Sequence, residues 1–473
     1  MRKATIGQWV MFSIVTALYL GFAVWVSNYW LLLGLPLIFD IYISKIIPWG
    51  AWKKSKNKNI RKVAEWVDAI LFALIAVYLI NLFIFQNYKI PSSSLEKTLL
   101  VGDHLFVSKL SYGPRVPNTP LSFPLTQHTF PIINTKSYIE WPQWDYKRLV
   151  GLGQVKRNDI VVFNFPAGDT VAVNVPNPDY YDLMNYYGWD QVNTDKATFG
   201  EVIYRPVDRR ENYVKRCIGM PGDSLQIIEN ETYINGELLP FAEHVQLNYF
   251  VETNGQIFTE KQFRDLDVSP DDYNKSLRLW SAQSTDAIDM ANLFEMIGIK
   301  RNEQNGYNPV YCVPLTKQSL EKLKAAGWAR SIHIEKDIFG GNTYPYGLYT
   351  GWTRDNFGPI WIPNKGASIA LTPENIALYN RCIVNYEGNT MTQSEGKVYI
   401  NGQLANSYTF KYDYYFMMGD NRHKSLDSRS WGFVPEDHVV GKPILVWLSI
   451  DKDRGWFDGR IRWNRLFKSV SAE

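Results

Sequence analysis

Histidine and cysteine are scarce in this chain of 473 residues, which contains six histidines and three cysteines. The histidines are scattered, and neither a His-Glu-x-x-His motif nor a Cys/His spacing typical of metal sites occurs. We therefore expect no metal and no cofactor. The cysteines, Cys217, Cys312 and Cys382, are odd in number and define no disulfide framework. One bridge with a leftover thiol and three separate buried thiols both stay open.

A long cluster of one charge sign is also missing. The 50 basic and 47 acidic residues leave a net charge of only +3, and the basic residues form no single stripe. This balance argues against nucleic acid as a partner. Hydrophobic residues make up 46% of the chain, which is enough for the core of one large or two medium domains.

Long apolar runs are concentrated at the N-terminus. The runs Trp9–Val26, Tyr29–Ile47 and Trp66–Phe85 are each near the roughly 20 residues that cross a bilayer. They predict three transmembrane helices, two within residues 1–62 and the third within 63–88. A cleavable signal peptide is the competing interpretation of the first run. That run is too long, and no small-x-small cleavage site follows it.

Charge around these runs predicts their orientation. Residues 53–62 are dense in lysine and arginine, whereas the turn at 27–28 carries no charge. The positive-inside rule therefore places the basic loop in the cytoplasm and the residues after about 86 outside it. Trp141 and Trp144 lie in a proline-containing loop on that outer side, and we expect them to contact the membrane interface.

From residue 89 onward the sequence is mostly of β type, with short β-branched and aromatic runs between Gly, Pro, Asn and Asp turns. A few helices interrupt this pattern, and their predicted ranges are 286–297, 316–326 and a short helix capped by Thr372 with Pro373 at its first position. We therefore expect a mostly β catalytic domain built from residues 89–240 and 405–473. Residues 241–404 would form an inserted α+β subdomain.

An internal sequence repeat supports the insertion. Lys-Arg-Cys-Ile at 215–218 precedes Tyr-Ile-Asn-Gly at 233–236, and Asn-Arg-Cys-Ile at 380–383 precedes Tyr-Ile-Asn-Gly at 399–402. The pattern predicts a duplicated unit of a strand and a hairpin with an Asn-Gly turn. The second copy has Asn380 in place of the lysine. Chance similarity is the alternative.

Three blocks carry the chemistry: Ile-Pro-Ser-Ser-Ser-Leu at 90–95, Tyr-Val-Lys-Arg-Cys-Ile-Gly-Met-Pro-Gly-Asp at 213–223, and Gly-Asp-Asn-Arg-His-Lys-Ser-Leu-Asp-Ser-Arg-Ser-Trp-Gly at 419–432. A serine hydroxyl becomes a good nucleophile only when a base removes its proton, and a lysine can be that base only when its amine is neutral. Desolvation lowers the pKa of lysine toward neutrality. The apolar neighbours of Lys215 offer such a setting, although an isolated lysine here is more often a solvated edge charge.

Together the blocks resemble those of bacterial type I signal peptidases, a family of serine endopeptidases with a Ser/Lys dyad. The serine block is similar to the family's Pro-Ser-x-Ser-Met element, with Leu95 in place of Met. Residues 155–163 resemble a characteristic strand of the family, with Asn158 in place of Gly. The resemblance implies a signal-peptidase/LexA-like β fold anchored by N-terminal transmembrane helices.

The resemblance also implies a role for each site residue. Ser94 would be the nucleophile and Lys215 the general base. The Ser92 hydroxyl and the backbone N–H of Ser94 would bind the oxyanion, and Ser425 would orient the lysine amine by a hydrogen bond. An ionic scaffold would support the site through Arg216, Asp420, Asp427 and Arg429.

One departure from the family pattern opens an alternative. Where the family shows Met-x-Pro-Thr after the nucleophile, this chain has Leu-Glu-Lys-Thr at 95–98. The change creates Ser94-x-x-Lys97, a pattern of penicillin-binding proteins and β-lactamases. That interpretation requires a helix beginning at the serine and a Lys-Thr-Gly element, and the sequence contains no Lys-Thr-Gly.

From the residues and the resemblance we expect a membrane-anchored serine endopeptidase that removes signal peptides from exported proteins. Its partners would be preprotein signal peptides and the lipid bilayer, with the protein-export machinery as a further candidate. It would be a multi-pass protein of the bacterial inner membrane with its catalytic domain on the periplasmic face. A maturation protease with few substrates and a non-catalytic membrane-anchored binding module are the alternatives.

Overall fold

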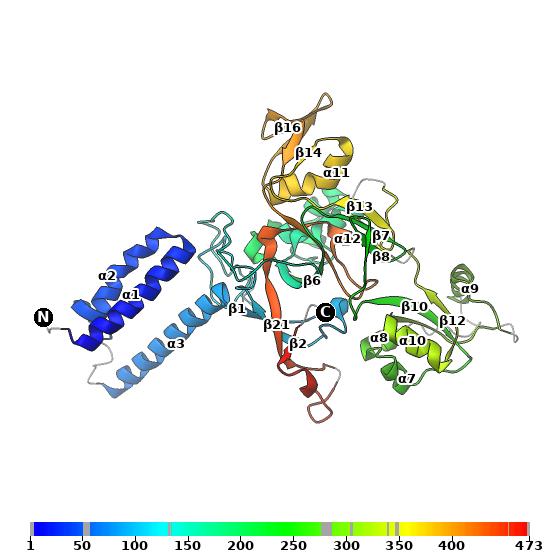
Figure 1. Ribbon diagram of the computed structural model, residues 1–473, viewed down its shortest axis with the longest axis horizontal. Coiled ribbons are helices and arrows are strands. Elements are labelled where there is room, and N and C mark those ends of the chain that lie inside the picture. Colours follow the sequence, from blue (N-terminus) through cyan, green and yellow to red (C-terminus); the bar gives the residue numbers. More distant parts are fainter. Residues whose placement is uncertain are drawn as a thin grey trace. The chain divides into compact units, whose positions relative to one another are not determined.

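The computed structural model describes residues 4–50, 57–130, 133, 135–275, 286–302, 306–337, 340–345, 350–452 and 454–470. Residues 1–86 and 108–154 form one compact unit, and residues 87–107 and 155–473 form another. Figure 1 shows the helices of the first unit and the strands of the second. The predicted basic loop lies partly outside the described residues, because 51–56 are not described.

Two helices of the first unit, α1 (Ile6–Val26) and α3 (Lys58–Phe83), are long and apolar enough to cross a membrane. The third apolar run, predicted as a transmembrane helix over 29–47, is helical over Tyr29–Ser44, and its role as a membrane span stays a prediction. That run is a composite of a 3-10 turn (Tyr29–Gly34), a short α2 (Leu35–Phe39) and a π turn (Asp40–Ser44). A proline early in α2 lacks the N–H that a continuous helix needs. At 16 residues this stretch is shorter than the roughly 20 residues of a straight membrane span. It runs back along α1, so that Phe39 contacts Trp9 and Phe12.

The loop at 108–154 is fastened to the C-terminal ends of α1 and α3 within the same unit. Trp25 Nε1 donates to Val150 O at 3.1 Å, and Lys147 Nζ donates to Val26 O at 2.7 Å. A small apolar cluster joins the same parts, and it contains Val26, Phe83, Val116 and Leu149. These contacts hold the loop against the helix ends.

The second unit is built on an eight-stranded sheet whose order joins segments far apart in sequence. Its strands run in the order β1 (Phe85–Lys89), β2 (Asp103–Ser108), β21 (Val439–Ser449), β3 (Ile160–Asn164), β6 (Asn212–Gly219), β19 (Tyr414–Met418) and β20 (Val434–Pro435), with β22 (Lys468–Ser469) beside β21. β6 lies between β3 and β19 and is antiparallel to both, with Lys215 opposite Val161 and Arg216 opposite Met418. The sheet thereby places the lysine block next to the strand that leads into the last block.

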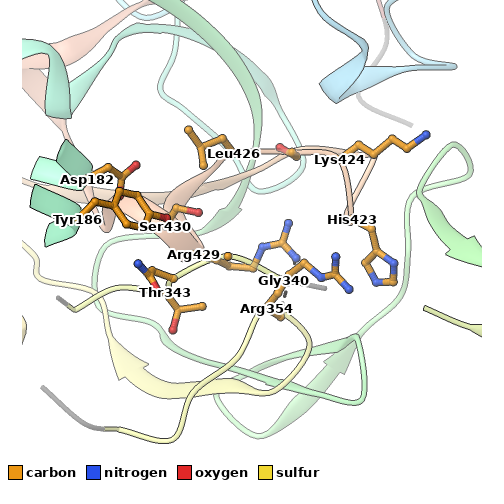
Figure 2. Close-up of a pocket in the computed structure, with 13 residues that line it drawn as sticks. Asp182, Tyr186, Gly340, Thr343, Arg354, His423, Lys424, Leu426, Arg429 and Ser430 are labelled. Carbon is orange, nitrogen blue, oxygen red and sulfur yellow. Dashed lines mark hydrogen bonds between the residues drawn. The ribbon is translucent and has the colours of Figure 1, made fainter. Parts of the chain in front are cut away.

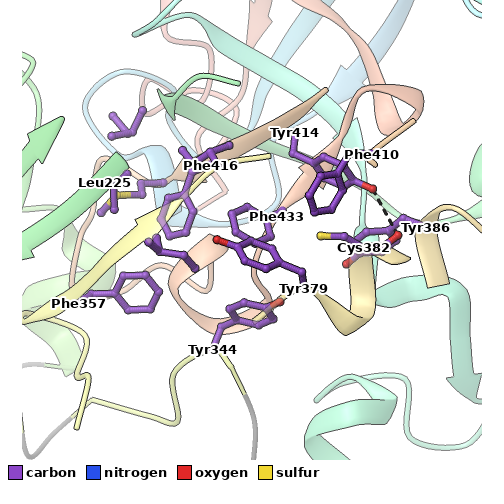
Figure 3. Packing of buried hydrophobic residues seen from close by; sticks show 14 of the residues in the cluster. Leu225, Tyr344, Phe357, Tyr379, Cys382, Tyr386, Phe410, Tyr414, Phe416 and Phe433 are labelled. Carbon is purple, nitrogen blue, oxygen red and sulfur yellow. Dashed lines mark hydrogen bonds between the residues drawn. The ribbon is translucent and has the colours of Figure 1, made fainter. Parts of the chain in front are cut away.

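An aromatic core covers the β19 end of this sheet (Figure 3). It packs residues of β7 (Ser224–Ile228), β13 (Phe357–Trp361) and β19 against Tyr344, Tyr379 and Phe433. A second apolar cluster lies beneath the serine block and includes Ile90, Leu95, Leu99, Leu105 and Val107. The site is therefore supported by hydrophobic packing from both ends of the sheet.

Smaller elements surround the sheet. Short strands β4 (Thr170–Ala172) and β5 (Val202–Tyr204) pair, and helices α4 (Tyr180–Tyr187), α5 (Trp189–Thr194) and α6 (Lys196–Phe199) lie between them in sequence. β14 (Ser368–Ala370) pairs with β18 (Ser407–Thr409). A four-residue helix, α12 (Ser428–Trp431), lies at the end of the last block. The helices at 180–199 were not predicted.

A separate three-stranded sheet, which we call the β10 layer (residues 246–335), has β10 (Gln246–Thr253) between β11 (Val310–Thr316) and β12 (Ala329–Ile334). Its helices are α7 (Glu260–Asp265), α8 (Pro270–Lys275), α9 (Asp286–Ile297) and α10 (Lys317–Ala326). The predicted α9 and α10 are confirmed, and the Oγ1 of Thr316 caps α10. Two apolar clusters, one including residues of α7 and α10 and the other residues of α9, give this layer its own core.

Of the predicted repeat of a strand and a hairpin, both hairpins are present. One hairpin joins β8 (Glu231–Ile234) to β9 (Glu237–Leu239), and the other joins β16 (Lys397–Ile400) to β17 (Gln403–Leu404). In the first, Asn235 Oδ1 accepts from Ser224 N at 2.8 Å, and in the second Asn401 Oδ1 accepts from Thr390 N at 2.9 Å. The two asparagines have φ angles of 53° and 52°, so the turns match in geometry as well.

The prediction that the second copy of the repeat begins with a strand was wrong. Residues 215–218 belong to β6, but residues 380–383 run from α11 (Pro373–Arg381) into a π turn (Cys382–Tyr386). Thr372 caps α11 as predicted, and Tyr379 and Cys382 are buried in the aromatic core. Helix capping and burial in the aromatic core therefore determine the structure of residues 380–383, although their sequence repeats that of a strand. The three cysteines are free thiols, so no bridge forms.

Candidate active site

Ser94 lies in a single 3-10 turn (Ser93–Leu95) that follows β1, and its side chain is buried. The turn packs against β6, the strand that carries Lys215. Asn421 holds it from the last block, because its backbone N–H donates to Ser94 O at 3.1 Å and its Nδ2 donates to Ser93 O at 3.3 Å. The structure thus brings the serine block together with both other blocks.

Ser92 precedes this turn in an extended conformation and is exposed. Its side chain makes no capping hydrogen bond to the turn. A serine at this position often accepts a hydrogen bond from the N–H groups that follow, and Ser92 accepts none from this turn.

Lys215 is buried in β6, with 4% of its surface exposed. Burial lowers the pKa of Lys215 from 10.5 to about 8, against the opposing charge of Asp427 and with the help of Arg429. At pH 7 a pKa of about 8 leaves about one tenth of the amine neutral, compared with about 0.03% at the ordinary pKa. The lysine therefore has the property that a general base requires.

Gly419 marks where the nucleophile turn and the last block meet. A Cβ placed on Gly419 would lie 2.2 Å from Ser425 Oγ and 2.6 Å from Ser94 O. Both atoms therefore lie next to the same backbone carbon, and only glycine fits between them. Ser425 Oγ is buried and has no hydrogen-bond partner among the described residues, so the expected bond to Lys215 is not formed here. The Ser425 hydroxyl can therefore still donate and accept a hydrogen bond.

Two buried ion pairs form the scaffold of the site. Arg216 binds Asp420 with two parallel bonds, Nε to Oδ1 at 2.7 Å and Nη2 to Oδ2 at 2.8 Å. Arg429 binds Asp427 in the same way, at 2.9 and 2.8 Å. Thr98 Oγ1 also donates to Asp420 Oδ2 at 2.6 Å. The two ion pairs contain the four charged residues to which the resemblance assigns the scaffold.

These pairs also set the charge state of the carboxylates. Burial acts to raise the pKa of Asp420, but hydrogen bonds and charge from Arg216 hold it below its usual value. The pKa of Asp427 is likewise lowered by Arg429 against the effect of burial. Asp427 accepts from Gly419 N at 3.1 Å as well, so the ionised carboxylate fixes the backbone beside Ser94. Sequence reasoning missed Thr98, Asn421 and Gly419 as supports, although all three stand in or next to the quoted blocks.

Two residues that depart from the family pattern have left-handed backbones. Asn158 has φ of 68°, which explains why the family favours glycine there, and its carbonyl accepts from Arg216 Nη1 at 2.9 Å. Lys97 has φ of 77°, an angle that proline cannot adopt. Lys97 Nζ donates to Asp267 O. The serine turn is three residues long and no helix begins there, so the helix required by the β-lactamase alternative is absent.

A pocket of about 250 Å³ lies beside Ser425 (Figure 2). Its two arginines are already paired, Arg354 with Asp355 at 2.8 Å and Arg429 with Asp427. Neither guanidinium is therefore available to hold an anion. Among the described residues, no three His, Cys, Asp or Glu side chains gather in a way that could hold a metal ion.

A serine on a tight turn and a buried lysine on the neighbouring strand of the β sheet are the arrangement expected of a serine hydrolase. The family profile described as "Signal peptidase, peptidase S26" matches residues 63–296 and 403–448. The chain belongs to this family of signal peptidases.

Curated relatives agree over most of the chain. It is 25% identical to "Signal peptidase I" of Buchnera aphidicola subsp. Acyrthosiphon pisum over 418 residues, which cover 88% of this chain and 83% of the relative. Identity to "Signal peptidase I" of Haemophilus influenzae is 21% over 88% of this chain and 79% of the relative. Identity to that of Helicobacter pylori is 23% over 86% of this chain and 92% of the relative.

Proposed function

We propose that this protein is a membrane-anchored serine endopeptidase that cleaves signal peptides from exported preproteins, with Ser94 as nucleophile and Lys215 as general base. The observation that carries the proposal is the burial of Lys215, which lowers its pKa to about 8 in the strand packed against the Ser94 turn. Burying a lysine costs stability because the charged amine loses its hydration, and a role as general base accounts for a buried lysine at this position.

The chemistry follows from these positions. Neutral Lys215 accepts the proton of Ser94 Oγ while the oxygen attacks the scissile carbonyl carbon. The oxyanion is bound by the Ser92 hydroxyl and the Ser94 backbone N–H. Lys215 then gives the proton to the leaving amine, and an acyl-enzyme ester remains on Ser94. Water attacks this ester, Lys215 takes the water proton, and return of that proton to Ser94 Oγ releases the signal peptide as a carboxylic acid. Ser425 is given no part in these steps, because its buried hydroxyl forms no bond to the lysine amine.

The substrate would lie extended along the edge of the sheet, so that alternate side chains enter two shallow pockets. The apolar cluster that contains Leu95, Leu99, Leu105 and Val107 supports this placement, because it includes Leu95, the residue next to Ser94. Small residues at the first and third positions before the cut would fit such pockets.

The membrane would bring enzyme and substrate together. Helices α1 and α3 are the candidate spans, and the catalytic unit would face the periplasm of a bacterial inner membrane. In the loop fastened to the ends of these helices, Trp141 and Trp144 are 80% and 44% exposed, which suits rings at the lipid–water interface. A substrate held by its own apolar helix in the same bilayer gains effective concentration. The β10 layer would be part of an inserted subdomain within residues 241–404, and the export machinery stays a candidate partner.

The test is cleavage of a model preprotein by the purified full-length chain in detergent. Ser94→Ala and Lys215→Met should each abolish product formation. Lys196→Met is the matched control, since Lys196 is exposed and pairs with exposed Glu201, and it should cleave like the wild type. If Ser94→Ala processed the precursor at the wild-type rate, Ser94 would not be the nucleophile and the proposed mechanism would be wrong. If the purified wild type released no product, a non-catalytic binding module would replace the proposal.

A further inference from the structure

The α7–α8 turn of the β10 layer, residues 266–272, contacts two loops of the site. These are the Ser94 loop, residues 94–99, and the Ser425 loop, residues 420–425. Its backbone is fixed locally, because Ser269 Oγ donates to Asp272 Oδ2 at 2.8 Å and accepts from Asp272 N at 3.3 Å. Asp267 has φ of 59°, so the chain reverses sharply before α8 begins at Pro270. This geometry presents Asp267 and Asp272 as two fixed acceptors.

Asp267 holds the nucleophile loop. Lys97, three residues after Ser94, donates from Nζ to Asp267 O and lies 3.5 Å from Asp267 Oδ2. Its side chain is only 11% exposed although it carries a charge. Without a proline at this position the loop lacks the usual rigid φ. The contact with Asp267 supplies a tertiary restraint instead.

Asp272 binds the Ser425 loop. Lys424, the neighbour of Ser425, forms an ion pair from Nζ to the buried Asp272 Oδ1 at 2.8 Å. Figure 2 shows Lys424 extending away from Arg354 and Arg429. The first residue of β10 reinforces this docking: Gln246 N donates to Asp420 O at 2.9 Å and Gln246 O accepts from Arg422 N at 3.0 Å.

We propose that the α7–α8 turn is a brace that fixes the Ser94 loop and the Ser425 loop relative to each other, with Lys97 and Lys424 as positioning residues. The proposal rests on the proposed function, because it assigns the brace to the alignment of Ser94 with its base. Small displacements of reacting groups cost large factors in rate. A second layer tied to both loops by lysines therefore has a direct effect on turnover.

The test measures turnover per active site, counted by titration of Ser94 with an acylating inhibitor. Lys97→Met and Lys424→Met should each lower kcat about 10-fold with KM changed less than about twofold, and Lys97→Arg and Lys424→Arg should recover much of the loss. Arg264→Met is the control, since Arg264 forms an exposed pair with Glu260 in α7. A purely structural role would lower the number of titrated sites and leave kcat per site unchanged.

A second measurement does not depend on activity. Backbone hydrogen exchange in the full-length chain should become faster at residues 94–99 and 420–425 in the two methionine variants, and should stay unchanged in β3. Unchanged exchange in both loops together with unchanged kcat per site would overturn the brace. Retained cleavage by Ser94→Ala would instead overturn the proposed function, and the exchange result would still decide the brace.

Discussion

Replacing Lys215 by methionine should make the protein more stable at neutral pH. Burial lowers the pKa of Lys215 from 10.5 to about 8, so the folded state binds the amine proton less tightly than the unfolded chain does. At pH 7 this difference costs the wild type about 3 kcal/mol of unfolding free energy, at about 1.4 kcal/mol per factor of ten in proton affinity. The methionine variant is free of this cost and keeps a similar side-chain volume.

The pH dependence has a definite sign. The unfolded chain binds more protons between about pH 8 and pH 10.5, so wild-type stability rises through this window relative to the variant. The advantage of Lys215→Met should therefore be full below about pH 8 and nearly absent above about pH 10.5. Urea unfolding in detergent at a series of pH values, followed by tryptophan fluorescence, measures it, with Lys196→Met as control. A constant difference across the pH range, or a variant less stable than wild type at pH 7, would refute the reasoning.

Three further substitutions probe the surroundings of the serine. Gly419→Ala should nearly abolish preprotein cleavage, because the new Cβ would lie 2.6 Å from Ser94 O; wild-type turnover would show that the turn can move. Ser92→Ala should lower kcat about 10²- to 10³-fold with little change in KM, as expected for the loss of an oxyanion donor, and unchanged single-turnover acylation would remove Ser92 from that role. Asp420→Ala should lower the unfolding free energy by about 3–5 kcal/mol by leaving Arg216 buried and unpaired, and a loss below about 1 kcal/mol in urea titrations would contradict this.

Local signals in the sequence were enough for much of the fold. The cap at Thr372 with Pro373 predicted α11, and the predicted ranges 286–297 and 316–326 agree with α9 and α10, because helix signals are short-range properties of the backbone. The Asn-Gly pairs at 235–236 and 401–402 predicted both hairpins for the same reason. The serine, lysine and last blocks likewise identified residues that the structure brings together.

Long-range packing accounts for what the sequence could not predict. Residues 380–383 repeat the letters of a strand, yet they complete a helix that a capping threonine begins and the aromatic core holds. The apolar run after residue 28 is helical over 29–44, but it changes from 3-10 to α to π geometry along its length, which the sequence pattern does not reveal. The contact between Lys97 and Asp267 spans 170 positions and leaves no local pattern. Such features depend on which surfaces meet and not on neighbouring residues.

The central claim is that a buried amine activates the serine hydroxyl. The pH dependence of kcat/KM for preprotein cleavage tests it most directly, since the acid limb reports the pKa of the base in the free enzyme. With Lys215 as that base, kcat/KM should rise tenfold per pH unit at low pH and level off above about pH 8. A limb that continues upward to above about pH 10, as for a solvated lysine, would contradict the account.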